Sequence, residues 1–262
     1  MSSTMPVAVV TGASRGIGAA VARRLGSAGY EVVVVGRSTE GHRHRVLPGT
    51  IDEVAASIES GGGRARAVAA DLSQPEGVEH LLVAIGDVRS ACRLLVNSAA
   101  YSVNFGTTIA SDPKKWNLAW TLNIIAPLRL IQSLAPEMAD AGGGGVVNIS
   151  SGAGIRTVIG QTPYGATKIA LERMTQDLAR DGSCPGVTFN VLRIETGVPT
   201  EAYLYVSGSL GITERTEPLH TPEEMALAIE WMGTNPDING EVFDLARLEA
   251  LGVLGPPAFL VT

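Results

Sequence analysis

Tyr164 and Lys168 stand four residues apart in the segment TPYGATKIAL (162–171), whose sequence is typical of a helix. Side chains at this spacing emerge from the same side of a helix, one above the other. A tyrosine is a poor acid or base at neutral pH because its reference pKa is about 10, and a nearby positive charge lowers that pKa. The pair therefore predicts proton transfer, although the spacing alone also fits a tyrosine beside a surface lysine.

The helix that carries this pair has a clear expected start. Thr162 can cap it, and Pro163 suits the first helical position. Small and apolar residues at helical spacing predict its buried face; they are Ala166, Ala170, Met174 and Leu178.

A glycine-rich segment, TGASRGIG, follows the first apolar run of the chain and leads directly into a helical pattern. Glycines at positions 12, 16 and 18 let an anion approach the backbone closely. The free N–H groups and the dipole at the start of a helix also favour an anion there. The segment therefore predicts a dinucleotide-binding loop at the first strand–helix junction.

The elements around these motifs alternate along the whole chain. Short β-branched runs predict strands at 6–10, 31–35, 65–70, 93–97, 145–150, 187–194 and 241–245. Helical patterns lie between them, at 16–28, 50–60, 75–86, 112–140, 163–180 and 222–233. Strand and helix in turn predict a doubly wound parallel sheet in one α/β domain, residues 1–262. Residues 37–50 and 197–221 are expected to be long loops.

Composition excludes several classes of protein. The chain has 45% hydrophobic and 18% charged residues and a formal net charge of −6, so nucleic acid and anionic membranes are not expected partners. Cys92 and Cys184 are too few for a disulfide framework, and we expect a cytoplasmic protein. No basic segment followed by an apolar stretch opens the chain, and no apolar run approaches the roughly 20 residues of a membrane span. The histidines do not cluster with carboxylates or cysteines, so no metal site is expected.

The G-x-x-x-G-x-G spacing and the Tyr-x-x-x-Lys pair together resemble the short-chain dehydrogenase/reductase family, over nearly the whole chain. The resemblance implies a Rossmann-type domain with a seven-stranded parallel sheet flanked by helices. It also implies a catalytic set of Asn123, Ser151, Tyr164 and Lys168. Ser151, thirteen residues before Tyr164, would polarise a substrate carbonyl, and its neighbour Ser150 should point to the opposite side of the strand.

The other two members of this set have implied roles as well. Lys168 would also hold the nicotinamide ribose hydroxyls, and Asn123 would hold a water that relays protons to the lysine. An asparagine in an apolar helix is costly unless its amide is satisfied, which favours a role for Asn123. Lys168 and an oxidised nicotinamide are together expected to lower the pKa of Tyr164 by about 2–3 units.

The end of the second strand predicts the nucleotide. Gly36 and Arg37 stand where an NAD-binding protein would have a carboxylate, and Arg37 together with Arg15 suits the 2′-phosphate of NADP(H). Together with the glycine segment, the resemblance to the family implies these cofactor contacts: Gly12, Ser14, Arg15, Gly16, Ile17, Gly18, Arg37, Asp71, Leu72, Asn97, Tyr164, Lys168, Val198 and Thr200.

The chain departs from the family pattern at two places. After the fourth strand, NSAA (97–100) replaces the common Asn-Asn-Ala-Gly, and after the sixth, Ile194 and Glu195 replace Pro-Gly. Glu195 could face the substrate pocket or pair with a nearby arginine. Residues 197–221 occupy the place of the family's substrate lid, and their apolar side chains could instead pack against a second subunit.

These features predict an NADP(H)-dependent carbonyl reductase or alcohol dehydrogenase that acts on a small carbonyl or alcohol. The resemblance to the family also implies a homodimer or homotetramer. Two alternatives stay open: an enoyl-thioester reductase on the same fold, and a regulator that binds NADPH without turnover.

Overall fold

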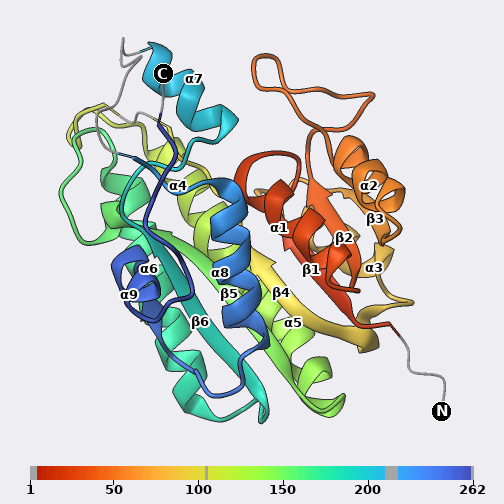
Figure 1. Ribbon diagram of the computed structural model, residues 1–262. Helices are drawn as coiled ribbons and strands as arrows, with labels where there is room; N and C mark the ends of the chain where they lie inside the picture. The colour runs from red at the N-terminus through yellow and green to blue at the C-terminus, as the bar shows by residue number, and fades with distance from the viewer. Residues whose placement is uncertain (1–4, 104–105, 210–217, 261–262) are drawn as a thin grey trace.

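The computed structural model describes residues 5–103, 106–209 and 218–260, and a seven-stranded parallel sheet runs through its centre (Figure 1). Its strands are β1 (Val7–Thr11), β2 (Glu31–Gly36), β3 (Arg64–Ala69), β4 (Cys92–Asn97), β5 (Gly144–Ser151), β6 (Val187–Ile194) and β7 (Val242–Phe243). They lie in the order β3-β2-β1-β4-β5-β6-β7. The predicted doubly wound α/β fold is confirmed.

The central strands carry mostly apolar side chains because helices cover both faces of the sheet. Along β1, Val7 and Val9 belong to the core under one helical layer, while Ala8 and Val10 belong to the core under the other. All four are 1% exposed or less. The absence of polar alternation in the sequence therefore reflects burial on both sides.

Two helical layers form this cover. The first contains α1 (Gly16–Ser27), α2 (Ile51–Ser60), α8 (Pro222–Thr234) and α9 (Leu245–Ala250). The second contains α3 (Pro75–Ala84), α5 (Ala126–Asp140) and α6 (Thr162–Asp181), with α4 (Pro113–Trp120) leading into α5. A further helix, α7 (Glu201–Ser209), lies beyond the sheet, at the top of Figure 1.

Several predicted boundaries were wrong. The segment predicted as a loop at 197–221 contains α7, and the last strand is two residues long because Leu245 already begins α9. Residues 210–217 of that segment lie outside the described residues. The predicted helix at 112–140 is interrupted by a turn of π-helix, η2 (Thr121–Ile125).

The combined helix Pro113–Asp140 is long and apolar enough to cross a membrane, contrary to the sequence expectation. However, 56% of its apolar window is buried inside the protein. The core helix of a soluble protein has the same character, so its length and composition are weak evidence for a membrane span.

Helix α6 begins one residue earlier than expected. Thr162 is its first residue rather than its cap, and the preceding Gln161 makes no side-chain cap bond. The hydroxyl of Thr162 instead lies 2.8 Å from that of Thr108. The expected apolar face is only partly buried, whereas the fully buried face of α6 includes Lys168 and Glu172. A polar side of this helix therefore packs against the sheet.

Candidate functional site

The candidate site lies at the carboxyl edge of the sheet, where the strand order reverses between β1 and β4. Ligands of open parallel sheets bind at such a switch point, outside the carboxyl ends of the strands. Here β1 ends at Thr11 opposite Asn97 of β4, and β5 ends at Ser151. The glycine segment and the serine are thus brought to the same edge.

Ser151, Tyr164 and Lys168 come together at the end of β5. A side-chain hydrogen bond joins Ser151 to Tyr164. The ammonium group of Lys168 lies 5.4 Å from the centre of the Tyr164 ring and donates to the carbonyl of Ile149 at 2.7 Å. Two elements therefore position the three side chains: β5 supplies the serine, and one turn of α6 supplies the other two.

Burial has the largest effect on the pKa values of Tyr164 and Lys168. Desolvation raises the pKa of Tyr164 above its ordinary value, and the hydrogen bond from Ser151 opposes that rise. Desolvation lowers the pKa of Lys168 to about 8, while the charge of Glu172 raises it. The tyrosine pKa is therefore raised in the protein alone, so the lowering expected from the sequence needs a positive charge beyond that of Lys168.

Asn123 lies in the π-turn η2, between α4 and α5. Its Oδ1 accepts from the backbone N–H of Tyr101 at 2.7 Å, and its Nδ2 donates to the hydroxyl of Thr167 at 2.9 Å. The amide is thereby satisfied and fixed, and it contacts the residue immediately before Lys168. Single π-turns inside α-helices are frequent at functional sites.

The neighbouring serine points away from Tyr164. The hydroxyl of Ser150 donates to Glu172 at 2.6 Å, on the buried face of α6. This geometry confirms the expected opposite orientation of Ser150, because successive side chains of a strand face opposite sides.

The glycine segment forms a tight turn between β1 and α1. Gly12 has φ +67° and Gly16 has φ +56°, which favour glycine. A Cβ at Gly12 would lie 2.8 Å from the backbone of Ala99, and one at Gly18 would lie 2.4 Å from the carbonyl oxygen of Gly12. The glycines thus allow the loop, β4 and α1 to approach one another closely.

The start of α1 already holds an anion. The backbone N–H of Gly16 donates to Oε2 of Glu201 at 2.9 Å. Thr200 packs beside the same glycine, 3.1 Å from the position of a Cβ. A carboxylate from the first turn of α7 thus occupies the position expected for a cofactor phosphate oxygen, and this loop meets the requirements of an anion site.

Arg37 directly follows β2, and Arg15 reaches the same place from the glycine turn before α1. Arg15 donates to the hydroxyl of Ser38 at 2.8 Å and to the carbonyls of Pro48 and Gly49, so it ties the segment 37–50 to the glycine turn. The side chain of Arg37 is 60% exposed, and its guanidinium is 3.9 Å from Asp71. Two cations and a hydroxyl are therefore gathered where the sequence predicts a 2′-phosphate.

The remaining predicted cofactor contacts differ in how exposed they are. Ser14 lies against Gly36 and Gly49, and Ile17 packs partly on the core. The side chains of Leu72, Asn97 and Val198 are 5% exposed or less. These three could meet a cofactor mainly through their backbone.

Sequence reasoning missed a charged pair beneath the cluster. Glu172 accepts from Arg193 of β6 at 2.9 and 2.5 Å, and Arg193 also lies 3.8 Å from Glu195. Of the two alternatives for Glu195, pairing with an arginine is thus confirmed. The available signal was an arginine inside the apolar strand sequence NVLRI, together with a glutamate four residues after Lys168.

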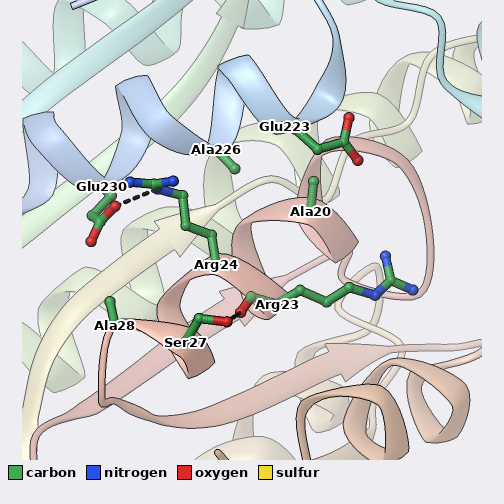
Figure 2. A pocket seen from close by; sticks show the side chains of 8 residues that line it. All are labelled: Ala20, Arg23, Arg24, Ser27, Ala28, Glu223, Ala226 and Glu230. Carbon is green, nitrogen blue, oxygen red and sulfur yellow. Dashed lines mark hydrogen bonds and ion pairs between the residues drawn. The ribbon is translucent and has the colours of Figure 1, made fainter. Parts of the chain in front are cut away.

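A separate cavity of about 440 Å³ lies between α1 and α8 (Figure 2). Arg24 and Glu230 form an ion pair across it, and Arg23 donates a hydrogen bond to the hydroxyl of Ser57 on α2. Its lining includes none of the predicted catalytic or cofactor residues. In the described part of the chain, no group of three or more metal-ligating side chains was found.

Comparisons with known proteins agree with this geometry. Residues 6–200 match the family model for short chain dehydrogenase. An uncharacterized oxidoreductase of Mycobacterium tuberculosis is 30% identical over 241 residues, which are 92% of this chain and 84% of that protein.

Solved structures resemble the chain over nearly its full length. A 3-oxoacyl (acyl-carrier-protein) reductase from Agrobacterium tumefaciens with NADP bound is 30% identical, with a TM-score of 0.80 and 92% of each chain covered. L-sorbose reductase from Gluconobacter frateurii, complexed with NADPH and L-sorbose, is 25% identical, with a TM-score of 0.81 over 92% of this chain and 95% of that one. The protein therefore belongs to the short-chain dehydrogenase/reductase family of NAD(P)-dependent oxidoreductases.

Proposed function

We propose that the protein is an NADP(H)-dependent carbonyl reductase or alcohol dehydrogenase. The observation that carries the proposal is the cluster of Ser151, Tyr164 and Lys168 at the same sheet edge as the glycine turn. One side of that edge suits an anionic dinucleotide, and the other suits proton transfer to an oxygen.

Each side chain has a chemical role in this proposal. The Ser151 hydroxyl donates a hydrogen bond to the substrate carbonyl oxygen, and Tyr164 delivers the proton to that oxygen. Lys168 stabilises the phenolate that remains and passes a proton back to it. Asn123, fixed by Tyr101 and Thr167, holds the water that returns a proton to Lys168. The nicotinamide supplies or accepts the hydride when the cofactor is bound.

The NADP(H) preference rests on Arg15, Arg37 and Ser38, with support from related structures that contain NADP or NADPH. Replacing Arg37 with alanine is expected to weaken NADPH binding about tenfold, because a charge-assisted bond to phosphate is lost. NADH binding should change little. Titrating the NADPH and NADH fluorescence of wild type and variant measures both.

A matched arginine provides the control for this titration. Arg64 is exposed on the edge strand β3, and its replacement with alanine should leave both affinities unchanged. Equal binding of NADPH and NADH by the wild type, or an unchanged NADPH affinity in Arg37→Ala, would refute the assignment of the nucleotide.

Glu201 should compete with the cofactor for the start of α1. Its carboxylate accepts from Gly16, so we expect Glu201→Gln to bind NADPH about fivefold more tightly, since the competing charge at the helix start is removed. A NADPH titration at low and high salt measures the effect, which should shrink as salt screens the charge. Glu223→Gln, an exposed carboxylate on α8, is the control. Unchanged or weaker binding in Glu201→Gln argues against competition.

The proposal also covers the domain organisation, oligomeric state and cellular location of the enzyme. We take residues 1–262 as one domain in a cytoplasmic homodimer or homotetramer, with residues 197–221 as a lid over a small carbonyl or alcohol substrate. The two cysteines are unpaired, as a reducing compartment favours. Tyr205 of the described part of the lid is 54% exposed, which leaves an aromatic ring available to a ligand or a second subunit.

A further inference from the structure

A charged pair lies beneath the candidate catalytic residues, on the buried side of α6. Glu172 is 3% exposed, and it accepts hydrogen bonds from two guanidinium nitrogens of Arg193 and from the hydroxyl of Ser150. Three elements thus meet at one carboxylate: α6, β5 and β6. Buried charges are retained only when they are paired and hydrogen-bonded, and this carboxylate is.

The same carboxylate stands next to Lys168. It follows the lysine by four residues, which places both side chains on one face of α6. The hydroxyl of Ser150 also lies 3.4 Å from the backbone carbonyl of Lys168, and Ser150 is the neighbour of Ser151. Glu172 is therefore connected to the cluster through Ser150, which lies next to Ser151 in the chain and contacts the backbone of Lys168.

We propose that Glu172, held by Arg193 and Ser150, is a positioning residue that fixes Lys168 and controls its charge, an inference that rests on the proposed function for its role in catalysis. The carboxylate stabilises the lysine as an ammonium ion in a desolvated position. Arg193 disfavours the ammonium form of Lys168, because its positive charge neutralises the carboxylate of Glu172.

In the described part of the chain, few charged and titratable groups lie near Lys168 and its neighbour Glu172. On α6 they are Tyr164 and Glu172, and on β6 they are Arg193 and Glu195. The segment after β5 adds Arg156, which hydrogen-bonds to the backbone carbonyl of Glu195. Strand β5 and the turn η2 contribute only neutral side chains to the cluster. The opposite charges of Glu172 and Arg193 are therefore the main contribution of side-chain charges to the electrostatic potential at the ammonium group of Lys168.

Opposite substitutions in this pair should have opposite effects. Glu172→Gln removes the negative charge and leaves the cation of Arg193, so the titration midpoint of Lys168 falls by about one pH unit. Arg193→Gln leaves the carboxylate unneutralised, and the midpoint rises. The double variant should titrate between the two single variants. A pair whose charges do not reach Lys168 would not produce shifts of opposite sign.

The sequence makes this measurement direct, because Lys114, Lys115 and Lys168 are its only lysines. Lys114 and Lys115 are exposed at the start of α4 and serve as internal references. Protein labelled with ¹³C at the lysine side chains is titrated by NMR, and the signal absent in Lys168→Arg assigns the buried lysine. In the wild type, its midpoint is expected near pH 8. Asp177→Asn, which removes the exposed partner of Arg173 on the same helix, is the matched control.

Opposite shifts in the two single variants, with unchanged reference lysines, support the proposal. An unchanged midpoint in Glu172→Gln, or shifts of the same sign, overturns it. If Glu172→Gln fails to fold, Arg193→Gln and the double variant decide: the midpoint must rise in the former and lie below it in the latter.

Kinetics then connect the result to catalysis. With a carbonyl substrate, the alkaline limb of the kcat/KM profile for reduction should move in the same direction as the lysine midpoint. The NMR titration needs no turnover. It therefore still tests the effect of Glu172 on Lys168 if the protein shows none of the proposed enzyme activity. Conversely, active variants whose lysine midpoint does not move would refute only the role of Glu172.

Discussion

Tyr164→Phe is expected to lose turnover by about 10²- to 10⁴-fold, the usual contribution of a positioned general acid, and to retain NADPH binding. The substitution removes only the hydroxyl. The ring that faces the ammonium group of Lys168 at 5.4 Å remains, and so do the glycine turn and the arginines at the end of β2. The loss should appear in kcat and kcat/KM together, since the proton is needed only in the reaction step.

The experiment compares NADPH oxidation with a panel of carbonyl substrates and NADPH fluorescence titration, in wild type and variant. Tyr30→Phe, immediately before β2 at the amino edge of the sheet and so away from the site, is the matched control and should keep its turnover. If the wild type binds NADPH but turns over no carbonyl, and Tyr164→Phe changes nothing, the results favour a regulator that binds NADPH without turnover. Activity on an enoyl thioester with no activity on carbonyls would favour the second enzyme alternative.

The fold class could be predicted because the patterns that indicate its strands and helices are local in the sequence. Runs such as EVVVV at 31–35 are buried on both faces, and each is followed by a helix that must cover one of them. The crossovers between parallel strands are expected to be right-handed, whereas the strand order is known only from the structure. Boundaries were less predictable, because β7 is held to two residues by the start of α9, which only the packed structure shows.

The site was predictable only in part, for a physical reason. Tyr164 and Lys168 interact within one helix, so their spacing alone indicates the contact. Glu172 and Arg193 lie 21 residues apart on different elements, and their contact depends on how α6 packs over β6. The bond between Gly16 and Glu201 spans 185 residues and likewise requires the tertiary fold.

Helix α6 shows how a pattern of small residues can mislead. Ala166 and Ala170 predicted the buried face, yet the α6 residues that are 3% exposed or less include Lys168, Glu172 and Thr175. The rule that polar residues lie outside fails here because each buried polar group has a partner: Ile149 for the lysine, Arg193 for the glutamate and Asn148 for the threonine. Such a satisfied polar face is the expected form of a helix that carries chemistry on its inner side.

Gly18→Ala is expected to weaken NADPH binding by roughly 100-fold, or about 3 kcal/mol, the upper end of the cost of overpacking. An added Cβ would lie 2.4 Å from the carbonyl oxygen of Gly12, a backbone atom that no rotamer change can move. Gly12 cannot retreat, because it already packs against the backbone of Ala99 and has φ +67°. The start of α1 must therefore move away from β1, and the N–H groups of the anion site move with it.

Thermal unfolding and NADPH titration, measured on the same samples, separate the two effects of this substitution. The variant should remain folded, with a melting temperature several degrees lower, and lose most of its affinity. Gly255→Ala is the control, because no atom lies within 4 Å of its added Cβ and its φ is not in the left-handed region. A folded Gly18→Ala protein with wild-type affinity for NADPH would mean that the cofactor phosphates do not bind at the start of α1. The glycine turn would then be only a packing device, and the nucleotide site would have to lie elsewhere on the carboxyl edge of the sheet.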